Sequence, residues 1–138
     1  MRDSLDVNEW IRFAQMDYDA AKNMSELHSP IPLEIVCYHC QQSAEKILKA
    51  YAIANGEPLI KTHDLETLLE QCVKHDDQFN VFAQICPELT TYAIFSRYPV
   101  SEDDINEHDM NTAIKYAFDI LKFTKSKLTE LGYGLELD

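Results

Sequence analysis

The clearest pattern in the chain is an apolar stripe at helical spacing between Leu33 and Tyr51. At 3.6 residues per turn, one face of this segment collects Leu33, Val36, Cys37, Cys40, Ala44, Ile47, Leu48 and Tyr51. The opposite side carries Tyr38, Gln42, Glu45 and Lys49, with Gln41 at the boundary. Glu45 precedes Lys49 by one turn, the favourable order for a charged pair. The prolines before Leu33 and Gly56 after Ala54 are typical of the two ends of a helix. This pattern predicts one amphipathic helix at the centre of a bundle.

Further helical segments are predicted on both sides of this one. The first begins near Asp6 and turns one face inward, made of Trp10, Phe13, Ala14, Ala21, Met24 and His28. Another begins at Thr62–Asp64, with an apolar side of Leu65, Leu68, Leu69, Cys72 and Val73. A fourth follows, is interrupted at Pro87 and ends before Pro99.

The last helix begins at Ser101 or after Asn106 and ends at Gly132. Its apolar stripe comprises Met110, Ala113, Ile114, Ala117, Leu121, Thr124, Leu128 and Leu131. Nowhere does the chain sustain the period-two alternation of a strand. We therefore expect an all-α fold, an up-and-down bundle of four main helices plus a short helix. Residues 1–138 form a single domain in this prediction, and 132–138 a mobile tail.

Charge restricts the partners that the protein can have. The 138 residues include 24 acidic and 12 basic side chains, a net charge of −12. Autonomous binding to DNA normally requires a basic face that neutralises phosphates, so this class is not expected and a basic protein partner fits better. No run of apolar residues is long enough for a transmembrane helix. The first ten residues contain no apolar run typical of a secretory signal, so we expect the cytoplasm.

The cysteines fit packing better than metal chemistry. Cys37 and Cys40 form a C-x-x-C pair, but the second pair that a structural zinc site normally needs is missing. All the cysteines fall within helical patterns, which favours reduced thiols in the core. We expect neither a metal nor a cofactor.

Two charged residues have more than one interpretation. Asp17 falls on the inward face of the first helix, where it either reaches water at the edge or anchors a base from another helix, with Arg97 as the candidate. Arg97, next to Tyr98, either receives a phosphate or a nucleobase or forms an ion pair with Asp17 or with the acids at 102 and 103. His63, directly before Asp64, is expected to be a capping or loop histidine rather than a catalytic one.

The segments CYHCQQSAEKILKAY, KTHDLETLL and FSRYPVSEDD, in this order and spacing, resemble the HEPN domain, as does AQMDYDAA in the first helix. The resemblance covers nearly the whole chain. It implies a compact helical bundle that is usually a homodimer, and association with minimal nucleotidyltransferases in two-component toxin–antitoxin modules. It also implies a nucleotide-binding role for the positions Gln42, Lys46, Lys49, His63, Asp64, Arg97 and Tyr98.

Some HEPN proteins are metal-independent RNases, and that activity requires an arginine and a histidine separated by four to six residues. The window after Arg97 holds Glu and Asp, and the windows after Arg2 and Arg12 also lack histidine. We therefore expect a non-catalytic protein that binds a nucleotidyltransferase or a nucleotide-like ligand, with Ile35, Tyr38 and Gln42 on an outer contact face. The alternative is an RNase toxin that assembles its active group from His63 and Arg97 across a dimer. A bundle whose polar residues serve only solubility and dimerisation is a third reading.

Overall fold

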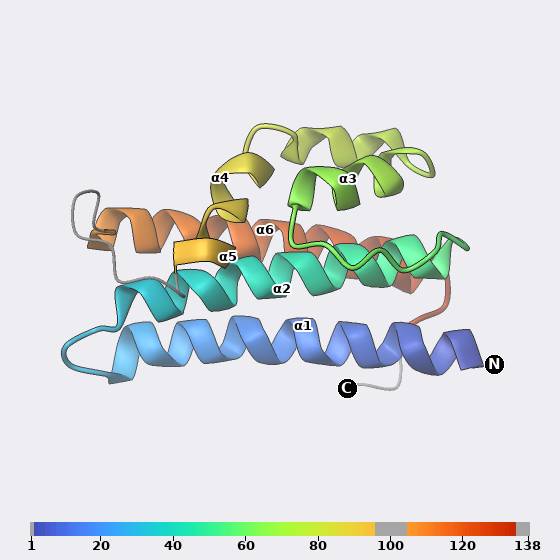
Figure 1. The fold of residues 1–138 in the computed structure, drawn as a ribbon. Coiled ribbons are helices and arrows are strands. Elements are labelled where there is room, and N and C mark those ends of the chain that lie inside the picture. The colour runs from blue at the N-terminus through green and yellow to red at the C-terminus, as the bar shows by residue number, and fades with distance from the viewer. Residues whose placement is uncertain (1, 96–104, 135–138) are drawn as a thin grey trace.

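The computed structural model describes the backbone of residues 2–95 and 105–134, and the side chains of residues 7–93 and 105–134. Three long helices run along the molecule: α1 (Arg2–Leu27), α2 (Leu33–Ala54) and α6 (Glu107–Glu130). In Figure 1, α1 and α2 run in opposite directions, whereas α2 and α6 run in the same direction. The described residues contain no strand, and the prediction of an all-α fold is confirmed.

Shorter elements carry the chain back between α2 and α6. They are α3 (Leu65–Val73), the 3-10 helix η1 (Asp77–Phe82), α4 (Cys86–Thr90) and α5 (Tyr92–Phe95). They lie on the side of α2 that α1 leaves uncovered (Figure 1). The up-and-down course therefore holds, but the predicted fourth main helix is broken into η1, α4 and α5. Pro87 in the first turn of α4 lacks the backbone N–H that a continuous helix would need.

The first helix is longer and rotated relative to its prediction. It begins at Arg2 rather than near Asp6. Its buried face is centred on Val7, Ile11, Ala14 and Ala21, whereas the predicted core residues Phe13 and His28 are exposed. The reason is that α1 packs against both α2 and α6. The side of α1 that faces these two helices is therefore the side that is buried.

The second helix is central, as predicted, and is buried on more than its apolar stripe. The stripe residues from Val36 to Tyr51 lie in the core. The polar side, expected to face outward, is covered as well, and Gln41, Gln42, Glu45 and Lys49 are all buried. The connection from Gly56 to Asp64 runs back along α2 (Figure 1), where His63 contacts Gln41 and Glu45, while Lys49 lies against Trp10 of α1. On the α1 side, the Ser43 hydroxyl donates to the carbonyl of Ala14 at 2.8 Å.

Local signals fix both ends of the last helix. The Asn106 side chain accepts from the backbone N–H of Asp109, and Asp109 accepts from the N–H of Asn106 in return, so α6 begins after Asn106. The alternative start at Ser101 falls outside the described residues. Leu131, predicted in the stripe, is exposed because the helix ends at Glu130 and Gly132 follows with a φ of +94°. Of the predicted tail, Gly134 donates its N–H to Asn8, and 135–138 are not described.

The prediction that the cysteines lie in the core is confirmed. All four thiols are free and buried. An aromatic cluster fills the space between α2, η1 and α6, with Phe79 4.6 Å from Tyr51 and 5.0 Å from Phe123 between ring centroids.

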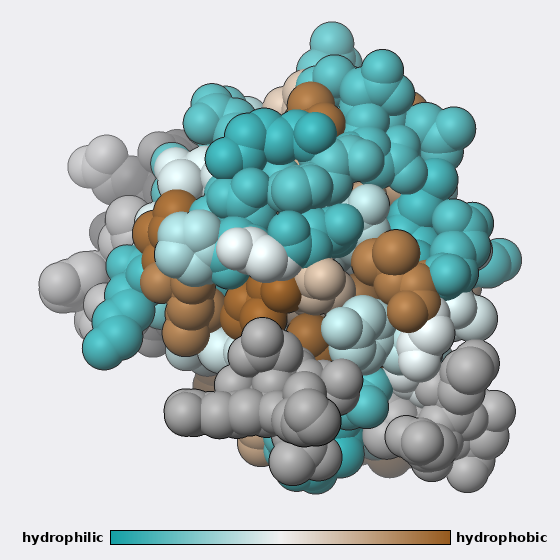
Figure 2. Space-filling model, turned by 90° about the vertical axis from the view of Figure 1, so that its right-hand side faces the viewer, coloured by the Kyte–Doolittle hydropathy of each residue, from teal (hydrophilic) through white to brown (hydrophobic). Residues whose placement is uncertain are grey.

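Figure 2 shows one end of the bundle, where hydrophilic residues cover the upper part, on the side of α3, and apolar residues form a band below. Within the described ranges, no helix has the length and apolar character needed to cross a membrane.

Candidate functional site

A buried carboxylate, Glu45, lies at the middle of a polar cluster on α2. Its side chain is only 4% exposed. One oxygen, Oε2, accepts from Nζ of Lys49 at 2.8 Å. The other, Oε1, accepts from Nε2 of Gln41 at 3.1 Å and contacts Nδ1 of His63 at 2.9 Å. Because an ionised carboxylate can only accept, Nδ1 of His63 carries the proton. Both oxygens of Glu45 are therefore satisfied.

The helical repeat and the connection before α3 assemble this cluster. Gln41 and Lys49 stand one turn before and one turn after Glu45, which places all three on one side of α2. Gln41 also donates to the backbone carbonyl of His63 at 3.0 Å, so one side chain fixes both the carboxylate and the connection. The Gln42 amide donates to Gln41 at 2.8 Å. Nζ of Lys49 lies 5.4 Å from the ring centroid of Trp10 on α1, which makes the cluster a junction of three segments.

Electrostatics keep Glu45 ionised. Burial by itself raises the pKa of this carboxyl, but hydrogen bonds from Lys49 and His63, together with the charge of Lys49, bring the pKa below its ordinary value. The buried ammonium of Lys49 is thus matched by a carboxylate that stays charged at neutral pH.

A second carboxylate, that of Asp17 on α1, contacts two basic side chains of α2. Oδ2 of Asp17 accepts from Nζ of Lys46 at 2.6 Å, and Oδ1 lies 2.9 Å from Nδ1 of His39. Burial by itself raises the pKa of Asp17. The hydrogen bonds and charges of His39 and Lys46 together lower this pKa by more, so it lies below its ordinary value. Asp17 therefore anchors bases from another helix, one of its two predicted alternatives. The base is Lys46 with His39, and the proposed pairing with Arg97 lies outside the described residues.

The structure brings together only part of the predicted ligand-binding set. Gln42, Lys49 and His63 gather around Glu45, and Lys46 belongs to the Asp17 pair. Asp64 instead caps α3, because its carboxylate accepts from the N–H of Glu66 and from the hydroxyl of Thr67. The remaining two predicted residues, Arg97 and Tyr98, are not described.

Sequence reasoning missed the residues that organise these clusters. Helical spacing predicts Glu45 in a solvent-facing pair with Lys49 and assigns no role to Gln41 or His39. The available signal was the i, i+4 series Gln41–Glu45–Lys49, but periodicity alone does not show that another segment covers it. Among the described residues, no group of three or more His, Cys, Asp or Glu side chains is arranged to hold a metal ion.

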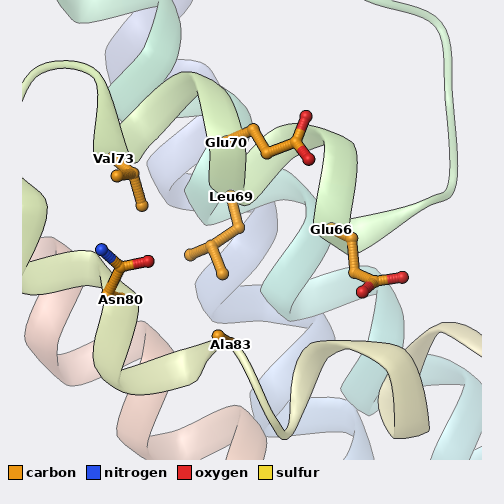
Figure 3. A pocket seen from close by; sticks show the side chains of 6 residues that line it. All are labelled: Glu66, Leu69, Glu70, Val73, Asn80 and Ala83. Atoms are coloured by element: carbon orange, nitrogen blue, oxygen red, sulfur yellow. The ribbon is translucent and has the colours of Figure 1, made fainter.

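A surface pocket of about 270 Å³ lies between α3 and η1 (Figure 3). Leu69 points into it, with Val73 and Ala83 beside it, and Asn80 faces it from η1. Glu66 and Glu70 stand one turn apart on α3 at its edge, and neither carboxylate has a cationic partner among the described residues. The field in this pocket is therefore negative, which disfavours a phosphate ligand.

The three long helices, the broken return segment and the Gln–Glu–Lys cluster on the central helix define a helical-bundle protein with a polar junction on its middle helix. The model of the HEPN domain family matches residues 7–128, so the chain belongs to the HEPN domain family. The match runs from the first described buried residue of α1 to the last buried residue of α6 and includes both carboxylate clusters. No curated protein and no solved structure matches the chain.

We predict that Glu45→Gln lowers the free energy of unfolding by about 3–5 kcal/mol, because it leaves the buried ammonium of Lys49 without a counter-charge. Urea unfolding followed by circular dichroism measures this loss. The matched control is Asp119→Asn, which breaks the exposed i, i+4 pair with Lys115 and should change stability by less than about 0.5 kcal/mol. Equal losses in the two variants would contradict a special role for the buried pair.

The stability difference between wild type and Glu45→Gln should depend on pH. Since the pKa of Glu45 is lower in the folded state, the unfolded chain takes up this proton first. The contribution of Glu45 is complete above the pKa of an unfolded glutamate, about 4.3. It is lost as pH falls through the lower folded pKa, so the two urea midpoints should converge on acidification below about pH 4. Asp17 is present in both proteins and cancels in the difference. Midpoints that stay equally far apart down to pH 2.5 would contradict the lowered pKa.

Proposed function

We propose that this chain is a non-catalytic HEPN protein that binds a partner nucleotidyltransferase, a nucleotide-like ligand, or both, as one component of a toxin–antitoxin module. The observation that carries the proposal is that the cations of α2 are already engaged. Lys46 is paired with Asp17 and Lys49 with Glu45. A phosphate stabiliser in RNA cleavage needs a cation that is available to the transition state. The Lys46 pair joins α2 to α1, and the Lys49 pair neutralises a buried carboxylate within α2, so neither lysine is available to a phosphate.

The sequence supports the same conclusion. None of the arginines is followed by a histidine at the spacing that RNase activity requires in the family. The net charge of −12 also disfavours autonomous binding of a polyanion and favours a partner protein with a basic surface.

The face of α1 and α2 outside the clusters offers surface for a homodimer or a partner. Phe13, Met16 and Ile35 are exposed apolar side chains on these two helices, and Tyr38 is half-buried. Gln42, expected on this face, is 8% exposed and bonded to Gln41 and Glu45, so it offers little contact area. Exposed aromatic and aliphatic side chains of this kind are common at the centres of interfaces.

One observation favours the RNase alternative. The carboxylate of Glu45 holds Nδ1 of His63, while the His63 side chain is 53% exposed. A carboxylate that fixes the tautomer of an accessible imidazole is the arrangement found in general bases. This candidate function would need a cation from elsewhere, and Arg97 is the residue predicted for it.

Purification of the tagged chain from its native host tests the binding proposal. We expect a nucleotidyltransferase, a nucleotide, or both to be recovered, identified by mass spectrometry. Ile35→Asp should reduce recovery of the protein partner about tenfold or more, because it places a charge in the apolar contact face. Val81→Asp is the matched control, since Val81 is an exposed apolar residue on η1, and it should leave recovery unchanged. Recovery of neither a nucleotidyltransferase nor a nucleotide would remove the main support for the proposal.

Incubation of the purified chain with single-stranded RNA in the presence of a chelator separates the two functions. We expect no cleavage above the background of a His63→Ala/Arg97→Ala variant, since that pair is the only group proposed for catalysis. Cleavage that both His63→Ala and Arg97→Ala abolish, without loss of folding by circular dichroism, would replace the binding proposal by the RNase alternative.

A further inference from the structure

The lysines of the chain differ in whether a carboxylate neutralises them. Ion pairs with acidic residues engage Lys22, Lys46, Lys49, Lys74, Lys115 and Lys127. Within the described residues, Lys61, Lys122 and Lys125 have no such partner. Two of these, Lys122 and Lys125, line the same pocket. In a chain with a net charge of −12, this is a local concentration of unneutralised positive charge.

The pocket lies in the groove between α1 and α6 and has a volume of about 240 Å³. Tyr18 from α1 and Phe118 from α6 form an aromatic wall, with ring centroids 5.8 Å apart. Leu121 is buried and adds an apolar surface, whereas Phe118 is 43% exposed. An exposed aromatic ring beside a hollow can stack with a flat ligand.

The two ammonium groups are held at this wall by neutral groups. Nζ of Lys125 donates to the Gln15 side-chain oxygen at 2.8 Å, and the Gln15 amide donates to Asp19 at 3.0 Å. Nζ of Lys122 lies 5.9 Å from the ring centroid of Phe118. Neither contact cancels the charge of the lysine, so both ammoniums stay available to an anion.

We propose that the groove between α1 and α6 is a binding site for a mononucleotide, whose base packs on Tyr18 and Phe118 and whose phosphates contact Lys122 and Lys125. The size of the pocket supports this division. Sites that enclose a whole drug-sized ligand measure roughly 300–1,000 Å³. A pocket below that range takes the flat base and leaves the phosphates at the rim, where the lysines are. The proposal rests on the nucleotide-binding half of the proposed function and places it away from α2, whose lysines are paired.

The pocket in Figure 3 is the natural contrast. It is similar in size, but its charged residues are Glu66 and Glu70, and it contains no aromatic ring. A nucleotide would meet repulsion there and attraction in the α1–α6 groove. A variant at Glu66 therefore tests whether the measured nucleotide affinity comes from the α1–α6 groove alone or also changes when charge is altered at another pocket.

Isothermal titration calorimetry of the full chain with AMP and ATP at low salt tests the site. We expect binding of both, tighter for ATP because it carries more charge, and weaker binding at higher salt. Lys122→Gln/Lys125→Gln should weaken ATP binding about tenfold or more, and Phe118→Leu should weaken AMP binding with less effect on salt dependence. Lys115→Gln, on the same helix but paired with Asp119, and Glu66→Gln should leave the affinity within about twofold of wild type. Thermal unfolding checks that each variant is folded.

Three results would overturn the site. One is no heat of binding for either nucleotide at millimolar concentration. Another is unchanged ATP affinity in the folded double lysine variant. The third is tripolyphosphate binding as tightly as ATP with no loss in Phe118→Leu, which would mean a charged patch without a base pocket. Failure of this site and failure of the proposed function are distinguishable, because a wild-type chain that binds neither AMP nor ATP but still recovers the nucleotidyltransferase overturns only the site.

Discussion

The arrangement around the central helix depends on how the carboxylate of Glu45 is satisfied. A buried charge costs several kcal/mol unless a counter-charge and hydrogen bonds offset it. Here Lys49 supplies the charge, and Gln41 and His63 supply the bonds. Because His63 belongs to the connection between α2 and α3, the same requirement holds that connection against α2. A polar network thereby sets the position of a segment that has few apolar side chains of its own.

The sequence predicted best what is decided locally. The bounds of α2 depend on residues within one or two turns. The cap at Asp64 and the start of α6 after Asn106 are equally local, and each is one of two alternatives that the sequence leaves open. The sequence predicted less well which faces of a helix are covered, because this depends on segments that are distant in the chain. Helical spacing shows that Glu45 and Lys49 share a face, but not that a connection covers that face. The same limit explains Phe13, which helical spacing predicts in the core but which is exposed in the structure.

The contacts of the candidate site also fall into local ones, which the sequence can predict, and distant ones, which it cannot. Glu45 and Lys49 are four residues apart, so their pairing could be foreseen. Asp17 pairs with Lys46, 29 residues away, because α1 and α2 lie side by side, and this contact needs the tertiary structure. Lys122 and Lys125 at the α1–α6 groove have no acidic partner within the part of the chain that the structure describes. Sequence patterns could not reveal this, because it depends on how distant segments pack.

The buried cysteines have a consequence for how the core can be observed. Burial raises the pKa of Cys37 and of Cys86 to about 12, and that of Cys40 and Cys72 further still. Alkylating reagents attack the thiolate, so the folded core is inert to them. Alkylation can proceed only when a helix opens transiently, so the rate of alkylation at each cysteine reports how readily its surroundings open. Since these sulfurs are distributed over α2, α3 and α4, the order in which they are alkylated would reveal which helix detaches first.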